Sequence, residues 1–259
     1  GRYIGTWQFV VAKDLDTPFI NWGMYRQMAF DEKTMVGPVL PFSDMGKMWH
    51  NKYQPKGIPM PFAVVINPDP LSAIASCAPA GIGEAEFTSL LMGEPVEVVK
   101  CVTSDLYVPA HAEIILEGVL VPNVTIDEAP FGEYTGYRTS PREPRTVYYV
   151  KAITMRKSPI MAMSNMGMPT DEGQLLRSFS LGLELDKLLR GQGIPITGVY
   201  MLPESTHHLM VVGVKPAYTN IATQIAQLAF GSKLGPWFHI VVVVDDKTDI
   251  YDKDELFYF

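Results

Sequence analysis

The sequence predicts an α+β protein in which a mostly-β domain, residues 1–160, is followed by a smaller α/β domain, residues 161–259. Two observations predict this class. Up to about residue 160, short runs of β-branched and aromatic residues alternate with turn-forming residues, and this pattern suits a barrel-like sheet. After residue 170, leucines recur at helical spacing, and a strand–strand–helix–strand pattern follows.

Seven segments of the first domain are rich in β-preferring residues, and we expect them to form strands: Trp7–Lys13, Trp22–Phe30, Phe62–Ile66, Val96–Thr103, Leu106–Val108, Glu113–Leu120 and Thr146–Thr154. Short helices are expected at Ser43–Tyr53, Leu71–Cys77 and Gly83–Met92. The last begins with acidic residues, as the helix dipole favours. Glu113 and Glu117 are isolated charges in a strand, so we expect both to face solvent.

The second domain starts with a helix. Pro169–Glu172 has the composition of a helix start, and the apolar spacing ends near Gly191–Gly193. Further elements are expected in the order strand, strand, helix, strand: Ile196–Met201, Leu209–Val214, Tyr218–Ala229 and Ile240–Val244. The last is the longest apolar stretch and suits a buried strand, being too short to cross a membrane.

The composition excludes several classes of partner. The 259 residues carry a formal net charge of −7, and no stripe of Lys and Arg is present, which argues against nucleic acid and membrane surfaces as partners. Cys77 and Cys101 match no metal or redox motif, so we expect buried thiols in a cytoplasmic protein. The chain opens without Met and ends on the apolar run Leu256–Phe259, so we expect a fragment of a longer protein.

Two carboxylates flank a turn at residues Glu128–Glu133, which read Glu-Ala-Pro-Phe-Gly-Glu. Pro130 fixes φ, and Gly132 permits a backbone that other residues do not tolerate, so the turn could hold Glu128 and Glu133 on one side. Two nearby carboxylates do not both ionise at low cost, so one becomes a proton donor near neutral pH. The alternative is a polar hairpin between two strands, and the turn alone leaves both open.

Arg26 is the second unusual charge. On a strand from Trp22, alternation would place Arg26 on the same face as Trp22, Met24 and Met28. A buried arginine needs an anionic partner, because an unpaired charge there is very costly. The alternative is an arginine that extends to solvent from a strand edge.

Asn21 and Arg26, followed by the Glu128–Glu133 turn, resemble the pattern of the UbiD family of decarboxylases, which use prenylated FMN. Further matches lie in Val98–Ala110, Glu113–Gly118, Thr170–Glu172 and Asp245–Ile250, so the resemblance runs along nearly the whole chain. It implies that residues 1–160 form the family's flavin-binding split barrel. It also implies that this chain lacks the N-terminal domain and the C-terminal segment of the longer family members.

The resemblance implies roles for individual residues. Arg26, Glu128 and Glu133 match the family's catalytic network. Asn21 and Glu84 match two ligands of the divalent ion, Mn²⁺ or Mg²⁺, that anchors the cofactor phosphate. The third ligand is commonly His, but the matching position here is Asp44, with His50 six residues further on; Asp is an adequate ligand for either ion. The implied cofactor-binding residues are Asn21, Gly23, Met24, Tyr25, Arg26, Ser76, Cys77, Pro79 and Lys233, with K⁺ near the loop that holds Ser76.

The implied reaction is the reversible, non-oxidative decarboxylation of an aromatic acid, with Arg26 orienting the carboxylate and Glu133 delivering a proton. Polar residues near the site favour the hydroxybenzoate branch, which acts on protocatechuate, 4-hydroxybenzoate and gallate. The expected substrate contacts are Tyr134, His207, His208 and Trp237, and His239 follows Trp237 closely. The family also implies a homodimer or homohexamer and a flavin prenyltransferase that supplies the cofactor.

Other functions stay open on the sequence. A subunit of a multi-component phenol or phenylphosphate carboxylase would need partner proteins for turnover. A non-decarboxylating split-barrel flavoprotein, such as a flavin reductase, would have no need for the carboxylate pair at Glu128 and Glu133. A bare binding or assembly module would turn over no substrate.

Overall fold

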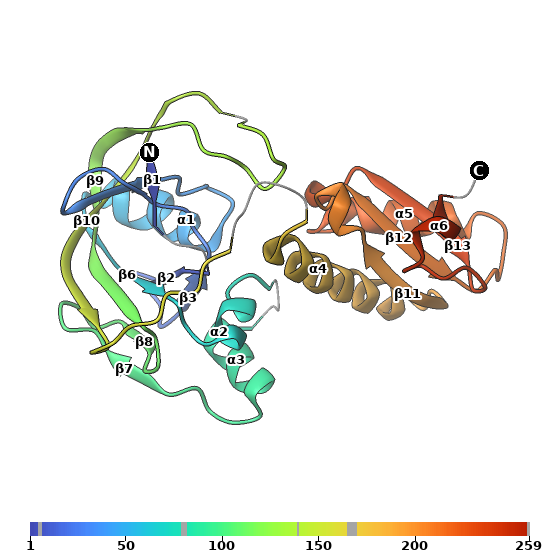
Figure 1. Cartoon of the computed structure of the whole chain (residues 1–259), viewed down its shortest axis with the longest axis horizontal. Coiled ribbons are helices and arrows are strands. Elements are labelled where there is room, and N and C mark those ends of the chain that lie inside the picture. The colour runs from blue at the N-terminus through green and yellow to red at the C-terminus, as the bar shows by residue number, and fades with distance from the viewer. Residues whose placement is uncertain (5–6, 79–81, 139, 165–169, 258–259) are drawn as a thin grey trace. The chain divides into compact units, whose positions relative to one another are not determined.

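The computed structural model describes residues 1–4, 7–78, 82–138, 140–164 and 170–257. The chain forms two compact units (Figure 1). The first comprises Gly1–Glu133 and Arg138–Asn165, and the second comprises Tyr134–Tyr137 and Met166–Phe259. The short segment Tyr134–Tyr137 therefore belongs with the second unit, although the chain on both sides of it belongs with the first.

The first unit is built on an eight-stranded sheet in the order β1-β4-β5-β10-β9-β6-β2-β3, and its neighbouring strands pair antiparallel. The strands are β1 (Arg2–Tyr3), β2 (Phe9–Lys13), β3 (Ile20–Gly23), β4 (Met28–Ala29), β5 (Thr34–Gly37), β6 (Met60–Ile66), β9 (Ile114–Glu128) and β10 (Glu143–Met155). A separate pair consists of β7 (Val98–Lys100) and β8 (Tyr107–Pro109). The expected mostly-β first part is confirmed.

The sheet is strongly curled along β9 and β10 (Figure 1). The register between these two strands shifts at Thr146/Val147 and again at Val150/Ala152, and such irregularities bend a strand pair and increase its twist. At Gly118 of β9, a Cβ would lie 1.9 Å from the carbonyl oxygen of Tyr149, so only glycine permits this close approach. The curl brings the far end of β9, where Glu128 lies, next to β1 and β4.

A helical segment fills one face of the curled sheet. Helix α1 (Asp44–Met48) is capped by Ser43 and continues as a π-helix, Trp49–Tyr53. Its buried Met45 and Trp49 pack with Phe62 and Tyr148 of the sheet. Fully burying each such side chain contributes roughly 1.5–3 kcal/mol. Two further helices of this unit are α2 (Pro70–Ala75) and α3 (Glu84–Met92), which pack against each other.

Several expectations for the first unit are wrong. The single strand expected at Trp22–Phe30 is broken, because β3 ends at Gly23 and residues 24–27 lie between it and β4. The ring of Tyr25 folds back over Gly23, where a Cβ would lie 2.6 Å from it, so glycine leaves room for the ring. Strand alternation therefore does not set the direction of Arg26. Cys77 is exposed, whereas Cys101 is buried as expected.

Glu113 and Glu117 do not face solvent. Both are buried, and each carboxylate has found partners that replace water. Glu113 pairs with Arg156 at 3.0 Å. Glu117 accepts hydrogen bonds from the backbone N–H groups of Val102 and Thr103 at 3.0 and 2.7 Å. These partners lie in other segments, so an isolated strand pattern does not reveal them.

The second unit is a smaller α/β structure. Strand β11 (Ile196–Met201) pairs antiparallel with β12 (Leu209–Val214), which pairs parallel with β13 (Ile240–Asp245). Helices α4 (Glu172–Gly191) and α5 (Ile221–Gly231) contribute to its core, and the short α6 spans Lys253–Leu256. Asp171 and Gln174 form a capping box at the start of α4. On β13, an edge strand, Ile240 is 52% exposed and Val241–Val244 are only partly buried, so the expectation of a buried strand is wrong.

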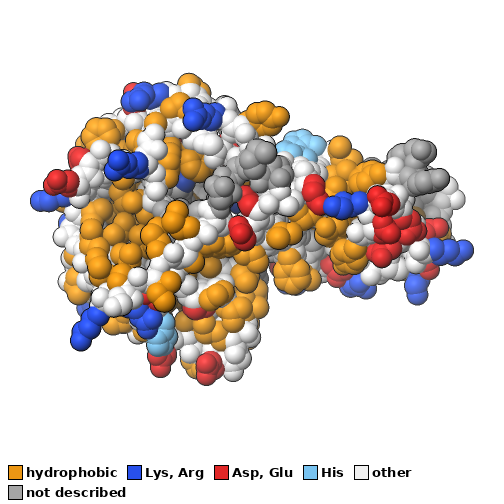
Figure 2. Space-filling model, viewed as in Figure 1, with side chains coloured by type: hydrophobic (Ala, Val, Ile, Leu, Met, Phe, Trp, Pro, Cys, Tyr) orange, Lys and Arg blue, Asp and Glu red, His pale blue; other side chains and the backbone are white. Residues whose placement is uncertain are grey.

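Hydrophobic side chains also lie on the surface, as the space-filling view shows (Figure 2). On the first unit the exposed ones include Tyr149, Ile153 and Met155 of β10 and Val98 and Val99 of β7. Within the described ranges, the helices are too short or too polar for any of them to traverse a lipid bilayer.

Candidate functional site

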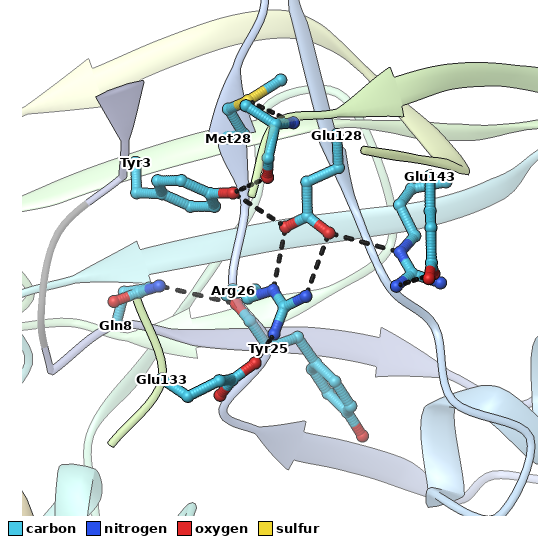
Figure 3. Close-up of polar contacts among 10 residues, drawn as sticks. Tyr3, Gln8, Tyr25, Arg26, Met28, Glu128, Glu133 and Glu143 are labelled. Atoms are coloured by element: carbon cyan, nitrogen blue, oxygen red, sulfur yellow. Dashed lines mark hydrogen bonds and ion pairs between the residues drawn. The ribbon is translucent and has the colours of Figure 1, made fainter. Parts of the chain in front are cut away.

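Arg26 joins the two carboxylates of the predicted turn in the first unit (Figure 3). Its Nε and Nη2 donate to Oε1 and Oε2 of Glu128 at 2.8 and 3.0 Å. Its Nη1 donates to Oε1 of Glu133 at 2.6 Å. The arginine is thus forked onto Glu128 and bonded once to Glu133, and charge-assisted bonds of this kind are about twice as strong as neutral ones.

Local structure places each member of this group. Arg26 stands in the irregular segment between β3 and β4, and Glu128 is the last residue of β9. The turn that follows closes through a β-bridge between Gly132 and Arg138. Its Phe131 ring lies 4.6 Å from the Arg26 guanidinium carbon, a cation–π contact. The Pro-Phe-Gly turn therefore supports the arginine as well as presenting Glu133.

The two carboxylates differ in environment. The Glu128 side chain is 3% exposed, and the Glu133 side chain is 22% exposed. Glu128 also accepts from the Tyr3 hydroxyl at 3.2 Å and from Arg145 Nε at 3.2 Å. Glu133 receives only the bond from Arg26 among the hydrogen bonds of the described residues. Glu128 is therefore fixed in place, while Glu133 keeps room for a proton and for a reacting molecule.

The surrounding groups hold defined protonation states. Burial, followed by the charge of Glu128, raises the pKa of Tyr3 to about 12, so its phenol remains a donor at neutral pH. That hydroxyl also approaches the carbonyl oxygen of Ala129 at 2.8 Å. Burial lowers the pKa of the Arg26 guanidinium, but the bonds to Glu128 and the two carboxylate charges outweigh it, so the pKa is raised overall.

Arg26 keeps capacity for a further anion. A guanidinium carries five N–H donors in a fixed fork. Three of them serve Glu128 and Glu133, and no other acceptor of Arg26 is found in the part of the chain that the structure describes. The side chain is 21% exposed. One N–H on each terminal nitrogen is therefore available to a carboxylate that enters from outside.

Asn21 and Glu84, the expected metal ligands, lie together in the first unit. Asn21 of β3 is buried, and its Nδ2 is 3.5 Å from Oε1 of Glu84, the first residue of α3. Glu84 Oε2 accepts from the backbone N–H of Trp22 at 3.0 Å. Burial raises the pKa of Glu84, and the charge of Asp44 adds to this. No cationic side chain pairs with Glu84 within the described ranges, so the residues fit a divalent cation.

Asp44, the third expected metal ligand, is less well placed than Asn21 and Glu84. Asp44 is exposed enough to pair with Lys47 at 2.8 Å, although its charge reaches Glu84. Across the described parts of the chain, no three His, Cys, Asp or Glu side chains form a ready metal cluster, so Asn21 must complete any such set. His50 does not replace Asp44, because its Nε2 contacts the Val39 carbonyl at 2.7 Å and its Nδ1 contacts Gln54 at 3.1 Å.

The residues expected to bind the cofactor lie in several places. Tyr25 donates through its hydroxyl to Asn21 Oδ1 at 3.0 Å. The Cys77 thiol lies 3.0 Å from the Met24 sulfur, so the end of α2 meets the segment before Arg26. Ser76 caps α2 through the Ala73 carbonyl at 2.8 Å. Pro79 falls outside the described residues, and Lys233 is an exposed residue after α5 in the second unit.

Three of the four residues expected to contact substrate meet within the second unit, around an arginine that the sequence did not single out. The guanidinium carbon of Arg177 lies 5.2 Å from the Tyr134 ring and 4.7 Å from the Trp237 ring. The Tyr134 ring lies 5.7 Å from the His207 ring. The backbone carbonyl of Tyr134 accepts a hydrogen bond from Gln174 Nε2 at 2.8 Å. Because Tyr134 directly follows Glu133 in the chain, these contacts hold the residue next to the candidate proton donor.

The two adjacent histidines differ. His207 is 1% exposed, and its Nε2 contacts the Gln174 carbonyl at 3.0 Å, while its buried Nδ1 has no partner among the described residues. Burial lowers its pKa to about 4, so the ring is neutral at pH 7. Its φ of 70° is an unusual backbone for a residue with a side chain. His208 instead contacts His239, with 2.8 Å between their Nδ1 atoms.

Sequence reasoning missed Tyr3 and Arg145, which complete the surroundings of Glu128, and Arg177 and Gln174, which hold Tyr134. The contact of Arg145 depends on the register of β9 and β10, which places Glu143 directly opposite Glu128. Nothing in the residues around Tyr3 marks it, since its contact with Glu128 depends on how β1 joins the sheet edge.

Comparison with known proteins places this arrangement in a family. Residues 1–169 match the model of the 3-octaprenyl-4-hydroxybenzoate carboxy-lyase Rift-related domain, UbiD, and residues 174–258 match that of the C-terminal domain of the same carboxy-lyase. Pyrrole-2-carboxylic acid decarboxylase of Pseudomonas aeruginosa is 30% identical over 99% of this chain and 53% of its own length. The chain thus spans about half the length of the curated relatives it matches.

Two solved structures extend the comparison. An evolved dimeric form of the UbiD-class enzyme HmfF from Pelotomaculum thermopropionicum, in complex with prenylated FMN, superposes with a TM-score of 0.88 at 30% identity, over 100% of this chain and 59% of that one. Vanillic acid decarboxylase of Sedimentibacter hydroxybenzoicus in its open form gives 0.87 at 27% identity, over 99% and 54%. The two family models together cover most of the chain, which therefore belongs to the UbiD family of carboxy-lyases.

Proposed function

We propose that this chain is the catalytic part of a decarboxylase that acts on aromatic or heteroaromatic carboxylic acids and uses prenylated FMN. The observation that carries the proposal is the forked Arg26, bound to Glu128 and Glu133 with two N–H groups left over. Its relatives support the reaction class, since one is a pyrrole-2-carboxylic acid decarboxylase and another a vanillic acid decarboxylase.

The reaction needs an electron sink and three contributions from the protein. Breaking the bond between the ring carbon and the carboxyl carbon leaves an electron pair on the ring carbon, and side chains alone cannot accept it. When bound, prenylated FMN supplies the electron sink. The protein must hold the substrate carboxylate, keep the reacting carbon in place, and give that carbon a proton after CO₂ leaves.

Arg26 fits the first task, because its two remaining N–H groups suit a carboxylate. Glu133 fits the last: its proton forms the new C–H bond, and water then returns a proton to the carboxylate. Glu128 holds Arg26 in place and does not itself need to exchange a proton. This division follows from the three guanidinium donors on Glu128 and the single donor on Glu133.

Cofactor anchoring is assigned to the residues around Asn21. Asn21, Glu84 and Asp44 would hold Mn²⁺ or Mg²⁺, which would bind the cofactor phosphate. Supporting this, Glu84 is a desolvated carboxylate without a cationic partner among the described residues. Gly23, Met24, Tyr25, Ser76 and Cys77 would line the cofactor near this ion. A K⁺ ion beside Ser76 and a phosphate contact from Lys233 remain predictions.

For the substrate we propose a hydroxybenzoate-type acid. Tyr134, His207, Trp237 and Arg177 give the second unit a polar and aromatic cluster of the kind that suits a hydroxylated ring. His207 is neutral at pH 7, so it would act as a hydrogen-bonding group and not as a charge. The pyrrole-2-carboxylic acid decarboxylase at 30% identity makes a heteroaromatic acid the substrate to test beside it.

We further propose a homo-oligomer, a homodimer or homohexamer, supplied with cofactor by a flavin prenyltransferase. Exposed apolar residues on β10 and β7 support an assembly face. One solved relative is described as a dimeric form.

The test is to produce the chain together with a flavin prenyltransferase and to record its mass spectrum and UV–visible spectrum. Protocatechuate and pyrrole-2-carboxylate are then added separately while CO₂ is measured. Bound prenylated FMN with CO₂ release from protocatechuate is the expected result. Release from pyrrole-2-carboxylate alone would keep the enzyme class and overturn the hydroxybenzoate assignment. Folded, cofactor-loaded chain that releases CO₂ from neither would favour a subunit that needs partner proteins.

A further inference from the structure

A second arginine reaches Glu128. Arg145 Nε donates to Glu128 Oε2 at 3.2 Å, and Arg145 Nη2 lies 2.6 Å from Glu143 Oε2. The register of β9 and β10 places Glu143 directly opposite Glu128. Glu143 and Arg145 are two residues apart on one strand, so they share a face. Arg145 therefore bridges two carboxylates that would otherwise oppose each other, an arrangement that destabilises a strand pair.

The titratable groups that interact with Glu128 come from every element packed against it: Tyr3 of β1, Arg26 between β3 and β4, Glu133 after β9, and Glu143, Arg145 and Tyr148 of β10. Burial raises the pKa of both phenols, so they remain uncharged at neutral pH. Fully ionised, the cluster has three carboxylates and two guanidiniums, 2 − 3 = −1.

The hydrogen bonds distinguish the three carboxylates. Oε1 of Glu128 accepts from Arg26 and Tyr3, and Oε2 accepts from Arg26 and Arg145. Glu143 has a 38% exposed side chain and pairs with Arg145. Glu133 has a single donor among the described residues, Arg26.

We propose that Arg145 is a positioning residue of this site: by bridging Glu128 and Glu143 it holds the Glu128 carboxylate against Arg26. The inference rests on the proposed function, in which Arg26 holds the substrate carboxylate. Without Arg145 the cluster carries one more negative charge, and Glu143, directly opposite Glu128, is left to repel it.

The test follows the titration of the carboxylates in the cofactor-free chain by ¹³C NMR of labelled glutamate. Arg145→Gln removes one positive charge, so the midpoint at which the cluster takes up its proton is expected to rise by about one pH unit. Arg145→Gln/Glu143→Gln removes one charge of each sign and is expected to return the midpoint towards that of the wild type. Glu143→Gln alone is expected to lower it, and this variant serves if Arg145→Gln does not fold.

Arg156→Gln is the matched control, because it breaks an ion pair of the same unit with Glu113, outside the cluster, and is expected to leave the midpoint unchanged. An unchanged midpoint in Arg145→Gln, or one that stays raised in the double variant, would overturn the proposal. In cofactor-loaded chain, Arg145→Gln is expected to lower kcat at pH 7 about tenfold or more, with a smaller change in KM. Loaded wild type that releases no CO₂ contradicts the proposed function alone, since the NMR midpoint tests Arg145 without turnover.

Discussion

Arg26 and Glu133 meet through a single contact, 2.6 Å between Nη1 and Oε1, at the end of a guanidinium whose other edge is fixed by Glu128. This asymmetry is the feature from which the proposed roles of the two carboxylates follow. Glu128 is buried and accepts from three guanidinium N–H groups, whereas Glu133 is partly exposed and accepts from one. A proton donor must release its proton and regain it, and only Glu133 has the freedom to do so.

Glu133→Gln tests the donor directly. The variant keeps the size of the side chain and can still accept from Arg26, so folding and cofactor loading are expected to persist. Loss of general acid catalysis is expected to lower kcat by about 10²–10⁴-fold. CO₂ release by the loaded protein measures the effect, and Glu97→Gln, an exposed carboxylate paired with His111, is the control. Turnover at the wild-type rate in Glu133→Gln would rule out the assignment.

The sequence predicts the part of the site that depends on residues close together in the chain. A proline and a glycine between Glu128 and Glu133 require a turn, and an arginine among apolar residues requires an anion. The structure joins these two requirements in one network. The long helix α4 could also be predicted from the sequence, because Asp171 and Gln174 form its capping box within four consecutive residues.

The remainder depends on contacts between distant segments. Arg145 reaches Glu128 only through the register of β9 and β10, which two irregularities set, and a one-residue slip would turn Arg145 to the other face. Glu117 appeared to be a surface residue because its partners, the N–H groups of Val102 and Thr103, belong to a separate loop. The break after Gly23, where the ring of Tyr25 lies back over the glycine, is likewise not signalled by strand propensity.

Arg26→Ala is expected to destabilise the first unit. Removing one partner of a buried ion pair typically costs about 3–5 kcal/mol, since the other charge is left without compensation. Here the loss is expected near the lower end, about 3 kcal/mol, because Arg145 and Tyr3 still reach Glu128. Urea unfolding followed by tryptophan fluorescence measures it.

The matched control for Arg26→Ala is Arg190→Ala, which breaks an exposed i, i+4 pair with Asp186 and is expected to cost about 0.3–0.5 kcal/mol. Adding Glu128→Gln to Arg26→Ala removes the stranded charge and is expected to recover part of the lost stability. Equal losses for Arg26→Ala and Arg190→Ala would show that the buried pair contributes nothing special to the fold.

Mn²⁺ is expected to stabilise the chain through Asn21 and Glu84. A ligand that binds only the folded state adds about 2.7 kcal/mol at one hundred times its Kd, which for a protein of this size is a rise in Tm of several degrees. Thermal unfolding with and without Mn²⁺ measures it, and Glu84→Gln is expected to abolish the rise. Glu86→Gln, in the same first turn of α3, is the control. A rise that survives in Glu84→Gln would place the ion elsewhere.

His207 is expected to make the second unit sensitive to acid. Burial lowers its pKa to about 4 from 6.5, so between these values the unfolded chain binds a proton that the folded chain excludes. The stabilising contribution is complete above pH 6.5 and falls as the pH drops towards 4, by roughly 3 kcal/mol in all. His207→Asn, which tolerates the positive φ, is expected to remove this dependence. Urea unfolding of both proteins at pH 7 and pH 5 measures the difference, and His111→Asn, at an exposed position, is expected to behave as the wild type. A wild-type stability that falls no further than that of His207→Asn over this range would mean that the ring takes up its proton in the folded chain.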